Sequence, residues 1–240
     1  TTTNAFTGAV TITTNDDSGT DADVTIDGGT TALILAASTI DGDLTVRSGN
    51  VSGITDSGTV TVGGNLAATT DANSGLINLG TLAVDGTVAL ATNGSGNATV
   101  VNDAGLNFAA SNVGGNLVAT ATTGNMTDSG ALTIAGTSSF TTSANNADIA
   151  LNTRTNAFTG AVTIRTNDDS GMDSDVMIDG GTTALILAAS TIDGDLTVRS
   201  GNASGITDSG TVTVGGNLAA TTDANSGLIN LGTLAVDGTV

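Results

Sequence analysis

Apolar residues along this chain recur at every second position in short runs, and glycine, asparagine and aspartate separate the runs. In the segment LTVR at positions 44–47, the leucine and the valine share one face while the threonine and the arginine share the other. This period of two is typical of β-strands. Pairs such as Asp41-Gly42 and Asn93-Gly94 suit the tight corners between strands. The pattern predicts an all-β chain of short strands without a helix of useful length.

A long tandem repeat dominates the sequence. Residues 153–240 repeat residues 1–88 at an offset of 152 and differ from them at only six positions. The changes are Thr2 to Arg154, Thr13 to Arg165, Thr20 to Met172, Ala22 to Ser174, Thr25 to Met177 and Val51 to Ala203. Such self-similarity predicts a single continuous β-solenoid over residues 1–240. Because the chain stops inside a repeat, we expect it to be a segment of a longer protein.

A shorter repeat lies inside the 152-residue unit and shares the core G-x-V/L-x-V/I/A. Spacings of 34, 22, 22, 29, 21 and 24 residues predict six coils per unit, with equivalent positions at Val10, Leu44, Leu66, Val88, Leu117, Ser138 and Val162. Each coil holds about three short apolar segments, which predicts three short strands and a triangular outline. Coils stacked ~4.8 Å apart would make the unit ~29 Å long.

Composition narrows the function. The chain carries 23 acidic and 4 basic residues, for a net charge of −19, so nucleic acid would be repelled. Hydrophobic residues make up 38% of the chain, enough for a core, yet no run is long enough to span a bilayer. Cysteine, histidine, lysine and glutamate are absent, which removes disulfides and most acid–base partners. We therefore expect no catalytic activity.

An acidic insertion is the strongest local anomaly and occurs in both copies. It contributes Asp16, Asp17, Asp21, Asp23, Asp27 and their copies Asp168, Asp169, Asp173, Asp175, Asp179. Carboxylates in a glycine-containing loop suit Ca²⁺, although this spacing matches neither an EF-hand nor the glycine-rich nonapeptide of calcium-binding toxins. The alternative is a solvated loop whose aspartates cap turns. Calcium is thus the only candidate cofactor.

Three further patterns have weaker functional interpretations. Asp41, Asp43 and Asp56 could form a carboxylate cluster like that of solenoid glycosidases, but no lysine, histidine or glutamate would share the acid–base work. Outward threonines such as Thr11 and Thr13 suggest an ice-binding face, but the matching positions in other coils are not uniform. The outward arginines are most simply local partners of aspartate.

The segments 39–70 and 114–142 resemble the coils of filamentous-haemagglutinin-type large exoproteins and autotransporter-like adhesins. The element T-D-S-G at Thr55, Thr127 and Thr207, which each time leads into a strand, carries most of the likeness. The resemblance implies a right-handed parallel β-helix, exported to the bacterial cell surface, that serves as a stalk, adhesin or filament. It transfers no functional residue to this chain.

Together these observations predict a structural repeat region of a secreted bacterial surface filament or fibrous adhesin, located outside the cell. Its expected partners are other coils of the same fibre, end to end within a longer chain and also side by side. One alternative is an adhesin region that recognises a surface glycan or protein, although the 2% aromatic content offers few anchors. Weaker alternatives are calcium-dependent lateral assembly and ice binding.

Overall fold

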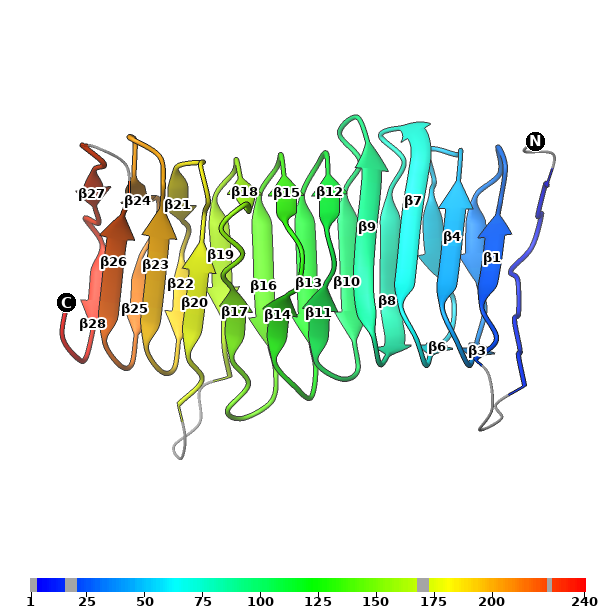
Figure 1. The fold of residues 1–240 in the computed structure, drawn as a ribbon, viewed down its shortest axis with the longest axis horizontal. Coiled ribbons are helices and arrows are strands. Elements are labelled where there is room, and N and C mark those ends of the chain that lie inside the picture. The colour runs from blue at the N-terminus through cyan, green and yellow to red at the C-terminus, as the bar shows by residue number, and fades with distance from the viewer. Residues whose placement is uncertain (1–3, 16–20, 168–172, 224–225) are drawn as a thin grey trace.

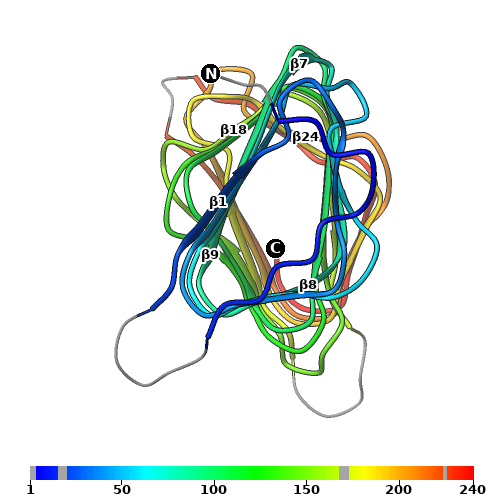
Figure 2. The ribbon, with the colours of Figure 1, turned by 90° about the vertical axis from the view of Figure 1, so that its right-hand side faces the viewer.

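The computed structural model describes residues 4–15, 21–167, 173–223 and 226–240. Within these residues the chain is all β, and every strand pairs in parallel with strands of neighbouring coils. Figure 1 shows a rod along which the chain advances steadily from one end to the other. Viewed from the N-terminal end, the chain winds clockwise as it recedes (Figure 2), so the solenoid is a right-handed parallel β-helix. The predicted fold class is confirmed.

Two long sheets form the walls of the rod. In the described residues, the 13-stranded sheet contains β1 (Val24–Asp27), β4 (Leu44–Ser48), β7 (Leu66–Asn73), β9 (Thr87–Asn93), β11 (Leu106–Phe108), β12 (Ser111–Val113), β14 (Met126–Asp128), β15 (Leu132–Ile134), β17 (Ile149–Leu151), β18 (Ala157–Phe158), β20 (Val176–Asp179), β23 (Leu196–Ser200) and β26 (Leu218–Thr222). The 15-stranded sheet contains β2 (Leu33–Leu35), β3 (Ser38–Ile40), β5 (Ile54–Asp56), β6 (Val60–Val62), β8 (Ile77–Val84), β10 (Ala98–Asn102), β13 (Leu117–Ala121), β16 (Ser138–Thr142), β19 (Val162–Arg165), β21 (Leu185–Leu187), β22 (Ser190–Ile192), β24 (Ile206–Asp208), β25 (Val212–Val214), β27 (Ile229–Asn230) and β28 (Leu234–Val236).

The core follows from the alternation in the sequence. In β4, Leu44, Val46 and Ser48 are buried, and Thr45 and Arg47 between them are exposed. The parallel register then places Leu44 over Leu66 and Leu66 over Val88, so that like residues form apolar columns along the rod. Each coil therefore buries its apolar face against the coils above and below as well as across the core.

The 152-residue unit contains seven coils rather than the six predicted. Val24 in β1 and its copy Val176 in β20 are joined by seven pairings through β4, β7, β9, β11, β14 and β17. The prediction of six coils is wrong because the two longest spacings between core positions, of 34 and 29 residues, each cover more than one coil. Val10 pairs with Leu35 of the 15-stranded sheet, whereas Leu44 lies on the 13-stranded sheet, so the 34-residue step covers one and a half coils. The 29-residue step from Val88 in β9 to Leu117 in β13 does the same, and seven coils make the unit ~34 Å long.

The outline is flattened between two broad walls, as Figure 2 shows, and the number of strands varies from coil to coil. The stretch β4, β5 and β6 supplies three strands to one coil. In the next coil β7 pairs with β4 and the single strand β8 covers both β5 and β6, so β7 and β8 complete that turn with two strands. The third strand thus arises where one wall strand is split in two.

The sheet whose strands are split in two alternates along the rod, and one sequence motif marks each change of sheet. The motif L-x-L/F-A-A-S begins at Leu33, Leu106 and Leu185. Its first strand is β2 on the 15-stranded sheet, then β11 on the 13-stranded sheet, then β21 on the 15-stranded sheet again. From β2 to β11 the chain makes three and a half coils, and the same from β11 to β21. The seven-coil unit therefore consists of two halves related by a half turn.

No helix in the described part of the chain is long and apolar enough to cross a membrane.

Candidate functional site

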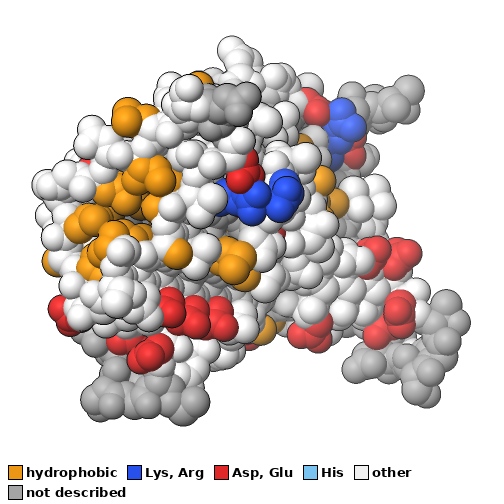
Figure 3. Space-filling view, turned by 60° about the vertical axis from the view of Figure 1, so that its left-hand side comes forward, with side chains coloured by type: hydrophobic (Ala, Val, Ile, Leu, Met, Phe, Trp, Pro, Cys, Tyr) orange, Lys and Arg blue, Asp and Glu red, His pale blue; other side chains and the backbone are white. Residues whose placement is uncertain are grey.

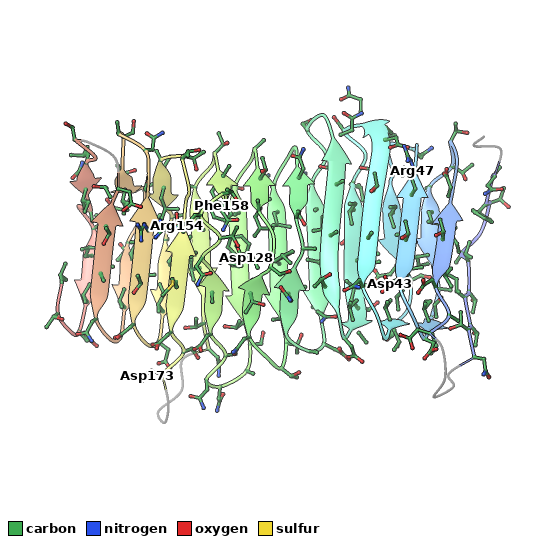
Figure 4. The ribbon with its side chains drawn as sticks, viewed as in Figure 1. Asp43, Arg47, Asp128, Arg154, Phe158 and Asp173 are labelled. Carbon is green, nitrogen blue, oxygen red and sulfur yellow. The ribbon has the colours of Figure 1, made fainter. Side chains whose placement is uncertain are left out.

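Asp173, the first described residue of the insertion's second copy after the gap at residues 168–172, lies at one corner of the rod and is labelled in Figure 4. Asp16, Asp17, Asp168 and Asp169 lie outside the described residues. Among the described residues, no three acidic side chains lie together in a way that could hold a metal ion. Calcium binding at the insertion therefore stays a prediction.

Four of the described aspartates of the insertion, Asp23, Asp27, Asp175 and Asp179, accept hydrogen bonds in turns or between coils. Asp27 Oδ1 accepts the N–H of Gly29 at 2.8 Å, and the copy Asp179 accepts the N–H of Gly181 at the same distance. Asp21 and Asp173 are exposed. These contacts match the turn-capping alternative for Asp27 and Asp179.

Asp23 begins a polar ladder that runs along the corner from coil to coil. Asp23 Oδ1 accepts the N–H of Asp43 at 2.9 Å, and Asp43 Oδ1 accepts the N–H of Asn65 at 2.7 Å. Asn65 Oδ1 then accepts the N–H of Thr87 at 2.8 Å. Each side chain thus satisfies the first amide of the coil above, where the backbone leaves the sheet ladder and would otherwise lack a partner.

The second unit rebuilds and extends this ladder. Asp148 accepts the N–H of Asp175 at 2.9 Å, and Asp175 accepts the N–H of Asp195 at 2.8 Å. Asn217 and Thr239 continue the series at 2.6 and 2.9 Å. In Figure 3 a row of acidic side chains follows one edge of the rod. Asp148, Asp175, Asp195 and Asn217 each accept a backbone N–H of the adjacent coil, so these side chains hold the stack together.

Sequence reasoning had the signal for this ladder and did not use it. In the core G-x-V/L-x-V/I/A, the second position is Ala9, Thr87 or Ala161 in some coils, but in five others it is Asp43, Asn65, Asn116, Asp195 or Asn217, whose short side chains end in an oxygen acceptor. The preceding glycine is also required, because a Cβ at Gly42 would overlap Asp23 Oδ1. Where its second position is Asp or Asn, the core therefore encodes both the strand and a corner hydrogen bond to the adjacent coil.

The T-D-S-G element is a clamp between three consecutive coils. Asp56 accepts hydrogen bonds from the backbone of Gly80 at 3.1 Å and from the N–H and hydroxyl of Thr81 at 2.7 and 2.8 Å. In the opposite direction, the N–H of Ser57 donates to the carbonyl of Leu35 at 2.7 Å. A Cβ at Gly58 would crowd the backbone of Ala37, so glycine permits this close approach.

The other copies of the clamp use equivalent contacts. Asp208 accepts hydrogen bonds from Gly232 and from Thr233, and the bond from the Thr233 hydroxyl is the first cause that lowers the pKa of this carboxyl. Asp128 accepts the amide of Asn156 at 2.7 Å and the N–H of Thr153.

Asp41, Asp43 and Asp56, considered above as a glycosidase-like cluster, each have a separate structural task. Asp41 Oδ2 accepts the N–H of Ala22 at 3.4 Å, while Asp43 and Asp56 hold the corner ladder and the clamp. All three therefore bind the backbone of an adjacent coil.

A set of buried serines was missed from the sequence. Ser111 Oγ accepts the N–H of Leu90 at 3.0 Å and donates to the carbonyl of Ala109 at 2.9 Å. Ser38 and Ser190 make the same two bonds at the equivalent places. Each lies where a split strand begins above an unsplit one, so the hydroxyl replaces a backbone acceptor that the bend has moved away. The recurring A-A-S triplet could have identified them.

Arg47 and its copy Arg199 each pair with an aspartate of the next coil. Arg47, labelled in Figure 4, donates to Asp71 at 2.5 Å, and this hydrogen bond is the main cause that raises the pKa of Arg47. Its copy Arg199 contacts Asp223 at 2.5 Å and lies 3.9 Å from Asp179. These contacts agree with the interpretation of the arginines as local charge partners.

One hollow lies in the second unit. It has a volume of about 380 Å³ and is lined by Asn152, Arg154, Met177, Ile178, Asp179, Thr197 and Arg199. Arg154 and Met177 replace threonines of the first unit, and the Met177 side chain is 44% exposed. Figure 3 shows basic, acidic and apolar groups side by side on this face. The two units therefore present different surfaces on the same scaffold.

The coils and their polar ladders define a repetitive parallel β-solenoid. The chain belongs to a family described as repeats of unknown function (DUF5649), which it matches over residues 21–79, 95–165 and 173–240. Neither the comparison with curated proteins nor the comparison with solved structures gives a match. The three matched segments begin close before β1, β10 and β20, so one 152-residue unit holds two family repeats, each of about three and a half coils.

Proposed function

We propose that this chain is the structural repeat region of a secreted bacterial surface filament or fibrous adhesin, and that it acts as a stiff acidic rod without catalytic activity. The observation that carries the proposal is the use of its polar side chains. The aspartates of the corner ladder and of the clamps bind the backbone of the neighbouring coil, so the groups that could do chemistry stabilise the stack instead.

Two further features support a rod of adjustable length. Coils contact mainly their immediate neighbours, so stability grows by the addition of similar interfaces. The unit spans a whole number of coils, so a copy enters the stack on the same wall and in the same register as the original. A net charge of −19 would keep such rods soluble.

Electron microscopy and fibre diffraction of the native material test the proposal. A structural filament should give a ~4.8 Å axial spacing from the coils and a ~34 Å repeat from the seven-coil unit. The same measurement with a calcium chelator tests whether the insertions bridge rods. Short single rods that end in a globular tip would contradict the filament and indicate a stalk.

The hollow around Met177 favours a second candidate, recognition of a surface glycan or protein by the second unit. An exposed methionine beside two arginines is an adaptable apolar surface with charged groups at its rim. The double variant Arg154→Thr, Met177→Thr restores the first-unit residues at both positions and should fold normally. Binding of cells or of glycan arrays that this variant loses, while the chain with Arg47→Thr keeps it, would support recognition here. Equal binding by all three chains would exclude the hollow.

A further inference from the structure

The outer surface of the 13-stranded sheet carries a groove in the second unit. Two hollows of about 270 and 380 Å³ share Asn152, Met177 and Thr197, so they form one continuous groove over β17, β20 and β23. Met177 divides the groove because its neighbours along the rod are the smaller Ala150 and Thr197. The Asn152 amide donates to Met177 Sδ at 3.3 Å and so holds this exposed side chain in place.

One end of the groove is acidic. It is lined by Asp148, Asp175 and Asp195, which lie one above another in the corner ladder. Each carboxylate uses Oδ1 to accept a backbone N–H of the adjacent coil, and no described residue donates to the Oδ2 atoms. Coils stacked ~4.8 Å apart hold these like charges close together, so a basic group of a partner would relieve their repulsion.

The other end of the groove is basic. It is lined by Arg154 and Arg199. Arg199 is paired with Asp223, whereas Arg154 is exposed and forms no ion pair with any described residue. Arg154 and Met177 also occupy two of the six positions at which the two units differ. In Figure 3 acidic, apolar and basic groups follow one another across this face of the rod. The groove therefore has an acidic end, an apolar middle and a basic end.

The spacing of these groups matches the spacing of side chains on an extended peptide. Asp195, Thr197 and Arg199 are alternate residues of one extended segment, so the two charged ends lie about 13 Å apart. A second extended chain laid across the sheet presents every other side chain on one face at the same intervals. A basic residue, an apolar residue and an acidic residue at alternate positions would thus meet the aspartates, Met177 and Arg154.

A protein segment fits this groove better than an oligosaccharide does. The acidic end favours a basic group, and no aromatic ring lines either hollow for a sugar to stack on. Strands β17, β20 and β23 each pair on both sides, so a partner cannot join the sheet as a further strand here. Recognition would therefore depend on side chains and on the complementary order of their charges.

We propose that the groove binds an extended segment of another protein in which a basic, an apolar and an acidic residue occupy alternate positions. This names the partner class for the second candidate function given above and rests on it. Because the charges of the groove are exposed, binding is weak for a single segment and weakens further as salt rises. Repeated units along a rod would compensate by engaging several segments at once.

The Met177 methyl group is the reporter for the test. The 240-residue chain is labelled at its methionine methyl groups for NMR, and the Met177 signal is assigned by its absence from Met177→Thr. Met126 is the internal control, because it is fully buried in β14. The probe is a capped heptapeptide with lysine, leucine and aspartate at its second, fourth and sixth positions and threonine elsewhere. A control peptide of the same composition places lysine and aspartate next to each other, so that they point to opposite faces.

The first peptide should shift the Met177 signal and leave that of Met126 unchanged, and the control peptide should bind about fivefold more weakly or less. Asp175→Asn removes a charge but keeps the acceptor for the Asp195 N–H, and Arg154→Thr restores the first-unit residue. Each variant should weaken binding about two- to fivefold. Arg165→Thr is the matched control, because it removes the same charge from β19 on the other sheet.

An unshifted Met177 signal at millimolar peptide, equal binding of the two peptides, or equal weakening by Arg165→Thr would overturn the proposal. Binding of an oligosaccharide in place of the peptide would overturn it as well, while the second candidate function would stand. The axial spacings of the rod do not involve the groove, so the structural proposal is tested separately.

Discussion

Ser111 provides the most direct test of how the solenoid changes its shape between walls. Its hydroxyl accepts the N–H of Leu90 at 3.0 Å, donates to the carbonyl of Ala109 at 2.9 Å, and is nearly inaccessible to solvent. Ser111→Ala would leave the Leu90 amide in the core without an acceptor. An unsatisfied buried donor costs about 1–3 kcal/mol. The smaller side chain adds little cavity, so the lost hydrogen bonds should account for most of the change.

The assay combines thermal unfolding with hydrogen exchange. A loss of about 2 kcal/mol should lower the melting temperature by roughly 4–8 °C in a chain of this size. Exchange should accelerate chiefly at Leu90 and its neighbours in β9. Ser139→Ala is the control, because Ser139 lies between the inward positions of β16. If Ser111→Ala melts like Ser139→Ala and the Leu90 amide stays protected, the role assigned to the buried serines is wrong.

Three further predictions follow from the clamps, corners and ion pairs. The pKa of Asp208 is lowered in the folded chain by its hydrogen bonds to Thr233 and Gly232. Its stabilising contribution is therefore present above the unfolded pKa of about 4 and is lost as the pH falls through the folded pKa. Asp208→Asn should flatten the acid limb of a stability–pH profile, and an unchanged limb would contradict this. Gly53→Ala should lower the urea midpoint strongly, because Gly53 has φ +64° and the added Cβ would overlap the Leu76 carbonyl. Gly80→Ala is the control and should change the midpoint little, because its added Cβ meets nothing within 4 Å. Equal midpoints for the two variants would refute the steric argument. Arg47→Ala should leave the melting temperature almost unchanged, since the Asp71 pair is exposed, and a large decrease would show that the pair matters more than its exposure suggests.

The strands and the solenoid could be predicted because their cause is local. Alternation such as that of Leu44 and Val46 reports directly which side chains face the core. Glycine and aspartate pairs mark the corners for equally local reasons of backbone geometry. Parallel stacking followed from the repeat itself, since near-identical segments can bury identical faces only by lying above one another.

The number of coils per unit was predicted wrongly because it depends on which of the two sheets each strand joins. The cores at Val88 and Leu117 have the same pattern, yet they lie on opposite sheets, and nothing local to either strand distinguishes the two. The roles of Asp43 and Asp56 were hidden for a similar reason. Their partners are amides more than twenty residues away in sequence, and one coil away in space, so the spacing of acidic residues along the chain does not reveal them.

The half-integer length of the family repeat explains why the long unit contains two of them. Three and a half coils place successive copies of the A-A-S motif on opposite walls, as Leu33 in β2 and Leu106 in β11 show. Two repeats restore the original wall, so Leu185 in β21 meets the same kind of neighbours as Leu33. A duplication of 152 residues therefore places each copied strand on the same wall as its original. This would let near-identical units be added to such a rod while the unit itself keeps two differently built halves.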